Sequence, residues 1–187
     1  MREERTLIRE SGSGDLQVPV TARDHIQGPD TAPVTLVEYA DYECPYSRRA
    51  YHVIKGLQRE LGDQLRFVYR NFPLREIHPH AQHAAEAAEA AAAQGKFWEM
   101  HDYLFEHQHA LDDAHLREYA ATLGLDPQVF EQDMVQHRYA GKIEDDLLGG
   151  MQSGVQGTPT FFVNGVRYDG GYDIESLLST IWEAAAP

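Results

Sequence analysis

The chain has 187 residues, of which 42% are hydrophobic and 25% charged, and its formal net charge is −14. This composition predicts one globular domain with a core, and the acidic excess repels phosphate backbones and anionic bilayers, so we expect no nucleic-acid partner and no direct membrane insertion. No apolar run is long enough to cross a membrane, and a single cysteine excludes both an internal disulfide and a zinc site built from several thiolates.

The N-terminal segment holds little that a core could bury. Residues 1–15 are charged and end in Ser11-Gly-Ser-Gly14, a composition that predicts a flexible tail. The segment lacks the apolar core and the cleavage site of a secretory signal, so we expect a cytoplasmic protein. Residues 24–33 are rich in turn-forming residues, and we expect an irregular approach to the first strand there.

A strand, a helix and a second strand are expected next. Residues 34–39 are β-branched and apolar enough for a buried strand. Pro45 suits the first position of a helix, because the amide donor that proline lacks would go unused there. Apolar residues at helical spacing extend this helix to Leu61, and Gly62 ends it. Residues 65–72 then form the second strand of a strand-helix-strand unit.

The middle of the chain changes to almost continuous helix. The helical pattern covers residues 78 to about 148 and begins with an alanine-rich run over residues 81–93. We expect Gly95, Gly124 and Gly141 to divide this all-helical insertion into several short helices. Strands return at residues 160–163 and 166–168 around the turn-forming pair Asn164-Gly165, and a last helix covers about residues 173–184.

The lone cysteine, Cys44, lies between the first strand and the helix, directly before Pro45. A sulfur at a helix N-terminus can accept amide hydrogen bonds and lies at the positive end of the helix dipole, which favours the thiolate. The run Cys44-Pro-Tyr-Ser47 has the spacing of a redox Cys-x-x-Cys motif, with serine in place of the second cysteine. Any disulfide must therefore include a sulfur atom from another molecule.

Four charged residues flank the thiol in the sequence. Asp41 and Glu43 disfavour a thiolate at this position, whereas Arg48 and Arg49 favour it. For exposed side chains each of these effects is worth about 1 kcal/mol or less. We expect the two pairs nearly to cancel.

Several motifs of the chain occur together in one family. They are Asp24-His-Ile-Gln-Gly-Pro29, Val34-Thr-Leu-Val-Glu-Tyr39, Tyr42-Glu-Cys-Pro-Tyr46, His78-Pro-His-Ala81 and Gly157-Thr-Pro-Thr-Phe-Phe162. Through them the chain resembles the DsbA-like thioredoxin-fold oxidoreductases, and it looks most like the thioredoxin-like domain that follows some bacterial NhaA-type sodium/proton antiporters. The resemblance implies an α/β, thioredoxin-like fold made of residues 16–76 and 149–187, with an all-helical insertion over residues 77–148.

The resemblance also implies roles at the thiol site. Cys44 would be the nucleophile, and Ser47 could donate a hydroxyl hydrogen bond to its thiolate but could not attack a mixed disulfide. Glu38 matches a buried acid of the family that moves protons during exchange. An ordinary strand glutamate with its carboxylate in solvent is the other interpretation, and the sequence leaves both open.

Four further residues would contact the substrate. Pro45 and Tyr46 lie beside the thiol in the sequence, and Thr158-Pro159 matches the cis-proline loop of the family, whose backbone receives an extended substrate peptide. A trans bond is the default for any single X-Pro pair. The strand start that follows Pro159 makes cis the expected form here.

We therefore expect a thiol–disulfide oxidoreductase that works through one thiol, by mixed-disulfide exchange with protein or glutathione disulfides. Two alternatives stay open. The first is a glutathione-dependent isomerase or transferase, since relatives of the kappa-class transferases activate glutathione with a serine in this fold. The second is a non-catalytic peptide-binding or regulatory module. No cofactor is expected beyond glutathione as a co-substrate. Ten histidines could in principle gather around a metal, but most fit polar helix faces, and we expect no metal site.

Overall fold

The computed structural model describes residues 14–186. The part of the expected flexible tail that falls on residues 1–13 lies outside the described residues. Within residues 14–186, no helix has both the length and the apolar character needed to span a membrane.

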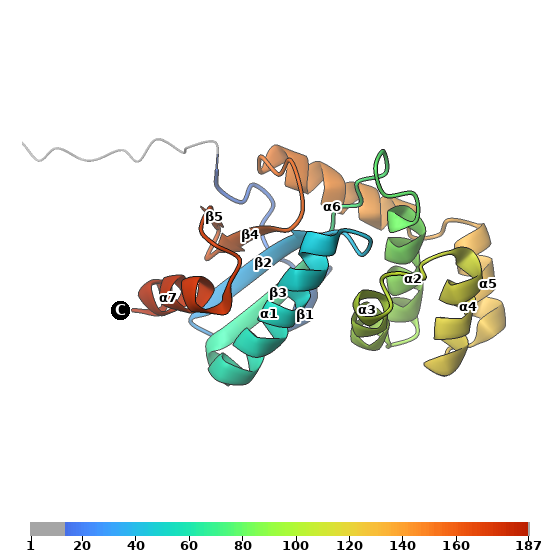
Figure 1. The fold of residues 1–187 in the computed structure, drawn as a ribbon, viewed down its shortest axis with the longest axis horizontal. Helices are drawn as coiled ribbons and strands as arrows, with labels where there is room; N and C mark the ends of the chain where they lie inside the picture. The colour runs from blue at the N-terminus through green and yellow to red at the C-terminus, as the bar shows by residue number, and fades with distance from the viewer. Residues whose placement is uncertain (1–13, 187) are drawn as a thin grey trace, which may run out of the picture.

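A mixed five-stranded sheet forms the centre of one part of the molecule (Figure 1). Its strands are β1 (His25–Gln27), β2 (Val34–Ala40), β3 (Leu65–Asn71), β4 (Thr160–Val163) and β5 (Val166–Tyr168), in the order β1-β3-β2-β4-β5. β2 and β3 are parallel, and the other three pairs are antiparallel. The predicted strand-helix-strand unit and the C-terminal hairpin are both confirmed.

Helices cover both faces of this sheet. α1 (Pro45–Leu61) and α7 (Ile174–Ala185) pack on one face and against each other, and α1 ends at Gly62 as predicted. The opposite face buries Tyr39, Val68 and Phe162 beneath residues of the N-terminal segment and of α6 (Ala140–Gln152). Successive residues of β2 alternate between the two cores, as the two-residue period of a strand requires.

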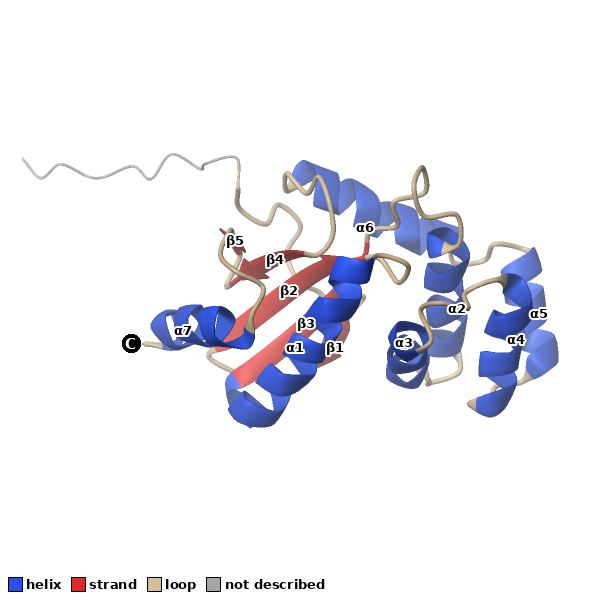
Figure 2. Ribbon diagram, in the orientation of Figure 1, coloured by secondary structure: helices blue, strands red, loops and turns tan. Residues whose placement is uncertain are grey.

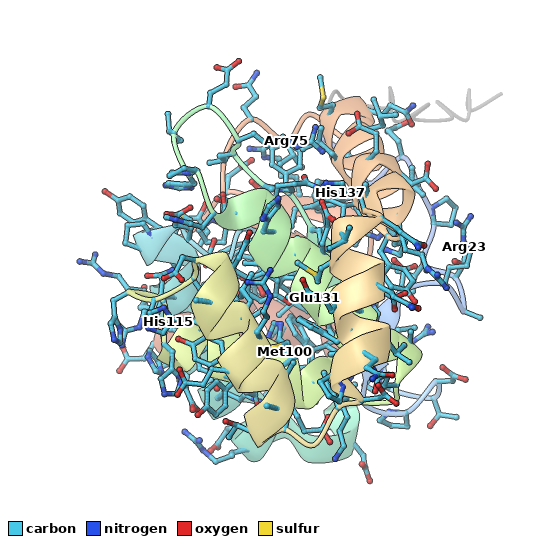
Figure 3. All side chains as sticks on the ribbon, turned by 90° about the vertical axis from the view of Figure 1, so that its right-hand side faces the viewer. Arg23, Arg75, Met100, His115, Glu131 and His137 are labelled. Carbon is cyan, nitrogen blue, oxygen red and sulfur yellow. The ribbon has the colours of Figure 1, made fainter. Side chains whose placement is uncertain are left out.

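A second part of the molecule is entirely helical and lies beside the end of the sheet (Figures 1 and 2). It contains α2 (Ala81–Ala93), α3 (Phe97–Glu106), α4 (Asp113–Thr122) and α5 (Pro127–Val135), and α6 runs from it back over the sheet. Figure 3 shows the fully buried Met100 in the middle of this block, whereas Arg75 and His115 lie at its edge. The alanine side chains of α2 are small enough for close packing against α3 and α5.

The structure differs from the sequence predictions at three places. β1 lies in the segment that we expected to be irregular, because its three residues pair with β3 without any apolar alternation of their own. Gly141 does not separate two helices but is the second residue of α6. α6 also continues to Gln152, so the expected boundary at residue 148 falls inside a helix.

Candidate active site

The thiol of Cys44 lies at the first residue before α1. Its backbone is extended (φ −73°, ψ 122°), Pro45 occupies the first helical turn, and the Cys44 carbonyl accepts the hydrogen bond of the Arg48 amide at 3.1 Å. This is the N-cap position that the sequence predicts. The residue is only 3% exposed, so the thiol is almost completely buried in this structure.

The sulfur atom faces the loop that precedes β4. Cys44 Sγ is 3.4 Å from the carbonyl oxygen of Thr158, to which the thiol donates, and the Thr158-Pro159 peptide bond is cis, as expected. Among the described residues, no amide of the first turn of α1 donates to Sγ, so the expected cap hydrogen bond is absent. The structure thus brings together residues more than a hundred positions apart in the sequence.

Ser47 lies one helical turn after Cys44 and is fully buried. Its Oγ accepts a hydrogen bond from the Asp41 amide at 3.3 Å, and within residues 14–186 no hydrogen bond connects it to Cys44 Sγ. The expected hydroxyl hydrogen bond to the sulfur is therefore not formed in this structure. Burial also keeps Ser47 from touching a bound thiol, which argues against the transferase alternative.

Asp41 and Glu43, which we expected to offset the nearby arginines, are both held by internal hydrogen bonds. The buried carboxylate of Asp41 accepts hydrogen bonds from the amides of Glu43 and Leu74 and pairs with His78 Nδ1 at 2.8 Å. Glu43 pairs in the same way with the amide and ring of His80. Asp41 is therefore not an exposed charge, because it is buried and holds a loop in place, and the near cancellation of the two charge pairs at the thiol stays a prediction.

Gln108 was not found by sequence reasoning. Its side-chain amide nitrogen donates to the carbonyl oxygens of Tyr42 and Cys44, both at 2.8 Å, from the loop between α3 and α4. The helical insertion thereby holds the turn that carries the thiol. No local signal marks a single loop glutamine for this role, since the contact depends on tertiary structure.

Glu38 is buried in the core, which overturns the interpretation of a solvent-exposed strand glutamate. It is 2% exposed, and because it lies between Leu36 and Ala40 on β2, its side chain enters the core beneath α1. Burial raises the pKa of Glu38 to about 8. One carboxylate oxygen has no hydrogen-bond partner among the described residues. The group can therefore carry a proton at neutral pH.

The two remaining sequence-predicted residues lie at the surface beside the thiol. Pro45 is exposed, and the Tyr46 side chain is 63% exposed with the Arg49 guanidinium 5.7 Å from the centre of its ring. The structure thus leaves both residues accessible from solvent, and their contact with a substrate stays a prediction.

The histidines are used individually. Six of them pair with a separate carboxylate each, and the buried His101 meets the Tyr42 hydroxyl at 3.1 Å. Burial lowers the pKa of His101 well below its ordinary value. Within residues 14–186, no three His, Cys, Asp or Glu side chains are grouped to hold a metal ion.

Comparisons with known proteins agree with this geometry. A family model described as thioredoxin matches residues 21–183. The Na(+)/H(+) antiporter NhaA 3 of Salinispora tropica is 49% identical over 187 residues, covering 99% of this chain and 28% of the relative. The chain thus spans little more than a quarter of the length of such relatives.

Solved structures match over most of both chains. BdbD from Bacillus subtilis is 25% identical with a TM-score of 0.79, covering 92% of this chain and 97% of that one. A thioredoxin-like oxidoreductase from Silicibacter pomeroyi is 28% identical with a TM-score of 0.77, covering 88% and 93%. The expected thioredoxin-like fold with a helical insertion is confirmed, and it is the fold of DsbA-like thiol–disulfide oxidoreductases.

Proposed function

The chain belongs to the thioredoxin family, and from that premise we propose that it exchanges disulfides through a single thiol, Cys44, with protein or glutathione disulfides as substrates. The observation that carries the proposal is the position of Cys44 Sγ, at the N-terminus of α1 and 3.4 Å from the Thr158 carbonyl. Cys44 is the only cysteine of the sequence, so exchange requires a sulfur from outside these 187 residues.

The exchange takes two steps, and each forms one sulfur–sulfur bond while it breaks another. The Cys44 thiolate attacks one sulfur of a substrate disulfide, so that a new bond joins Cys44 to that sulfur and the other sulfur leaves as a thiolate. An external thiolate such as glutathione then attacks the mixed disulfide at the substrate sulfur and regenerates the Cys44 thiolate. In sum, one substrate sulfur leaves as a thiolate, the other leaves joined to the external thiol in a new disulfide, and the sulfur of the external thiol is the one oxidised.

The neighbouring residues support these steps. In the proposal, Thr158 and Pro159 align the substrate chain beside the sulfur, and Pro45 with the exposed Tyr46 contacts it from the other side. Glu38, whose pKa burial raises to about 8, holds a proton in the core and can return it when the thiolate is regenerated. Ser47 fills the position of a second cysteine and cannot release the substrate.

The test is incubation of the protein with glutathione disulfide, followed by mass spectrometry of the intact chain. We expect one glutathionyl adduct per chain, removed by added glutathione, and none with Cys44→Ala. Ser47→Ala is the matched control, because it changes the neighbouring side chain and leaves the sulfur in place. Absence of any adduct on the folded wild-type chain would overturn the proposal.

A non-catalytic peptide-binding module is the second candidate, because Cys44 is only 3% exposed while Tyr46 is 63% exposed. Such a module keeps the substrate surface and leaves the thiol unreactive. It predicts that Cys44 reacts with no disulfide while a peptide still binds next to Tyr46. Titration of a peptide into Cys44→Ala and into the double variant Cys44→Ala/Tyr46→Ala distinguishes the two candidates.

We also propose that the site works in the cytoplasm as one part of a larger protein. The names of the relatives and the share of their length that this chain spans support it, as does a lone thiol without structural disulfides, which suits a reducing compartment. In cells that express the full gene product, a cysteine placed at the exposed Glu118 should resist a membrane-impermeant thiol reagent until lysis. Labelling in intact cells would contradict this location.

A further inference from the structure

Two arginines beside the thiol differ from almost all other cations of the protein. Arg48 and Arg49 are exposed in the first turns of α1, and neither forms an ion pair with any residue that the structure describes. Every other lysine and arginine among residues 14–186 is in an ion pair, except Arg59 at the far end of the same helix. The chain has a net charge of −14, so it is unusual for two arginines next to the thiol residue to lack an ion-pair partner.

The acidic groups that could neutralise these arginines are already engaged. Asp41 is buried and pairs with His78, and Glu43 pairs with His80.

The acidic residues of α3, one of the helices that contact α1, are engaged in the same way. On α3, Asp102 pairs with Lys55 and Glu106 accepts the Tyr51 hydroxyl. The first turns of α1 therefore present positive charge to solvent, and the negative charges nearby are held by other partners.

Both arginines can reach a molecule attached to the sulfur. Arg48 follows Cys44 by four residues, so the two lie on the same side of the helix one turn apart. The Arg49 guanidinium lies 5.7 Å from the ring centre of Tyr46, an exposed residue two positions after Cys44 in the sequence. Guanidinium groups bind carboxylates in a forked, two-bond geometry.

Resting on the exchange function proposed above, we propose that Arg48 and Arg49 select anionic disulfides, in which carboxylates lie close to the sulfur that Cys44 attacks. Disulfides of small acidic thiols belong to this class, and glutathione disulfide is the probe for it. Arg48 binds a carboxylate directly above the sulfur. Arg49, ordered by Tyr46, binds a second one at the rim.

The experiment compares three small disulfides that differ in charge. Glutathione disulfide is anionic, bis(2-hydroxyethyl) disulfide is neutral and cystamine is cationic. The second-order rate of Cys44 modification by each is measured by acid quenching and mass spectrometry, for the wild type and for Arg48→Gln, Arg49→Gln and the double variant. The ratio of the glutathione rate to the neutral rate cancels any change in the thiolate fraction, because both reactions use the same thiolate.

The charge dependence has a defined direction. We expect this ratio to fall about threefold for each arginine replaced, the size of an exposed ion-pair effect, and the ratio for cystamine to rise. Arg59→Gln is the matched control, since it removes an unpaired arginine from the last turn of the same helix and should leave both ratios unchanged. Added salt should lower the wild-type ratio and not that of the double variant.

The possible failures are distinguishable. If the wild type reacts with all three disulfides but the ratio is the same in the double variant, the exchange function stands and the selection by Arg48 and Arg49 is wrong. If none of the three disulfides reacts with the folded wild type, the exchange function itself is wrong. A glutathione disulfide with esterified carboxylates separates charge from shape, because it should react at the reduced ratio even with the wild type.

Discussion

The side-chain amide of Gln108 donates a 2.8 Å hydrogen bond to the carbonyl oxygen of Cys44, and a second of equal length to that of Tyr42. One side chain of the helical insertion therefore holds the turn that carries the thiol by the Tyr42–Glu43 and Cys44–Pro45 peptide groups, which lie on either side of the thiol residue. This contact links the two parts of the molecule at the reactive residue. It gives the insertion a direct influence on the position of the sulfur.

Gln108→Ala is expected to loosen this turn without unfolding the protein. Loss of two hydrogen bonds from carbonyls in a partly buried site should lower the free energy of unfolding by about 1–2 kcal/mol. The exchange of the Glu43 and Cys44 amides with solvent should become faster, and glutathione adduct formation should slow. Urea unfolding, hydrogen exchange and the adduct rate measure the three effects.

A matched control for this variant exists elsewhere in the insertion. The Gln94 side chain holds the Asp126 backbone through two hydrogen bonds, far from the thiol. Gln94→Ala should cost a similar amount of stability and leave the adduct rate unchanged. Equal slowing of adduct formation in both variants would show that Gln108 acts only through overall stability.

Glu38→Gln is expected to change how stability depends on pH. Burial raises the pKa of Glu38 to about 8 from an ordinary value of 4.5, so the folded state keeps a proton that the unfolded state releases between these values. Stability from this group is therefore fully present below pH 4.5 and falls as the pH rises toward 8. The loss should be about 1.4 kcal/mol per pH unit within that window.

The measurement compares urea unfolding of wild type and Glu38→Gln at pH 5.5 and pH 7.5. Because glutamine does not ionise, the wild type should lose about 3 kcal/mol more than the variant between the two conditions. All other titrating groups are common to both proteins and cancel in the difference. An unchanged difference would mean that Glu38 ionises normally and does not store a proton in the core.

The elements of the fold that could be predicted from the sequence are those marked by a pattern in neighbouring residues. The strand at residues 34–40 and the helix from Pro45 to Leu61 carry their own apolar periods and their own start and stop residues. β1 has three residues and exists because β3 accepts it as a partner, so no local pattern marks it.

The site shows the same division. Short motifs of adjacent residues were enough to single out Cys44, Ser47 and Thr158-Pro159 as candidate site residues. The burial of Glu38 was left open, since a strand buried on both faces gives no alternation that assigns one residue to a core. The contact of Gln108 with Cys44 spans 64 positions and could be known only from the fold.

Arg70→Met should destabilise the protein strongly, because Arg70 is the buried centre of a polar cluster. Its guanidinium binds the Asp24 carboxylate at 2.7 Å, the Tyr39 hydroxyl, and the carbonyls of Val18 and Pro19. Although burial opposes ionisation, hydrogen bonds from Arg70 hold the pKa of Asp24 below its ordinary value. Removal of the arginine leaves this buried carboxylate unpaired, at a cost of about 3–5 kcal/mol.

Thermal unfolding and limited proteolysis test this role. Arg70→Met should melt at a lower temperature and become sensitive to cleavage around residues 18–24, since the arginine holds that segment on the sheet. The double variant Arg70→Met/Asp24→Asn should recover part of the loss, because the unpaired charge is gone. A double variant no more stable than the single one would show that Asp24 is not the source of the cost.

Ser47→Cys should convert the site from single-thiol to dithiol chemistry. Residue 47 lies one turn into α1, and the Cα atoms of positions three apart at a helix start are separated by about 5 Å, within the range that a disulfide bridges. Ser47 is fully buried, so the new sulfur would lie under Cys44 and out of reach of the substrate. Cys44 should then form a mixed disulfide that residue 47 resolves.

Two measurements distinguish an internal disulfide from a second thiol that stays free. After treatment with glutathione disulfide and removal of the reagent, Ser47→Cys should show no free thiol and no adduct mass, because the second cysteine displaces glutathione and closes an internal disulfide. The wild type and Ser47→Ala should instead retain the adduct. A stable adduct on Ser47→Cys, with its second thiol still free, would mean that the turn held by Gln108 does not let the two sulfurs meet. Serine at this position would then be only part of what confines the protein to partners that supply the second sulfur.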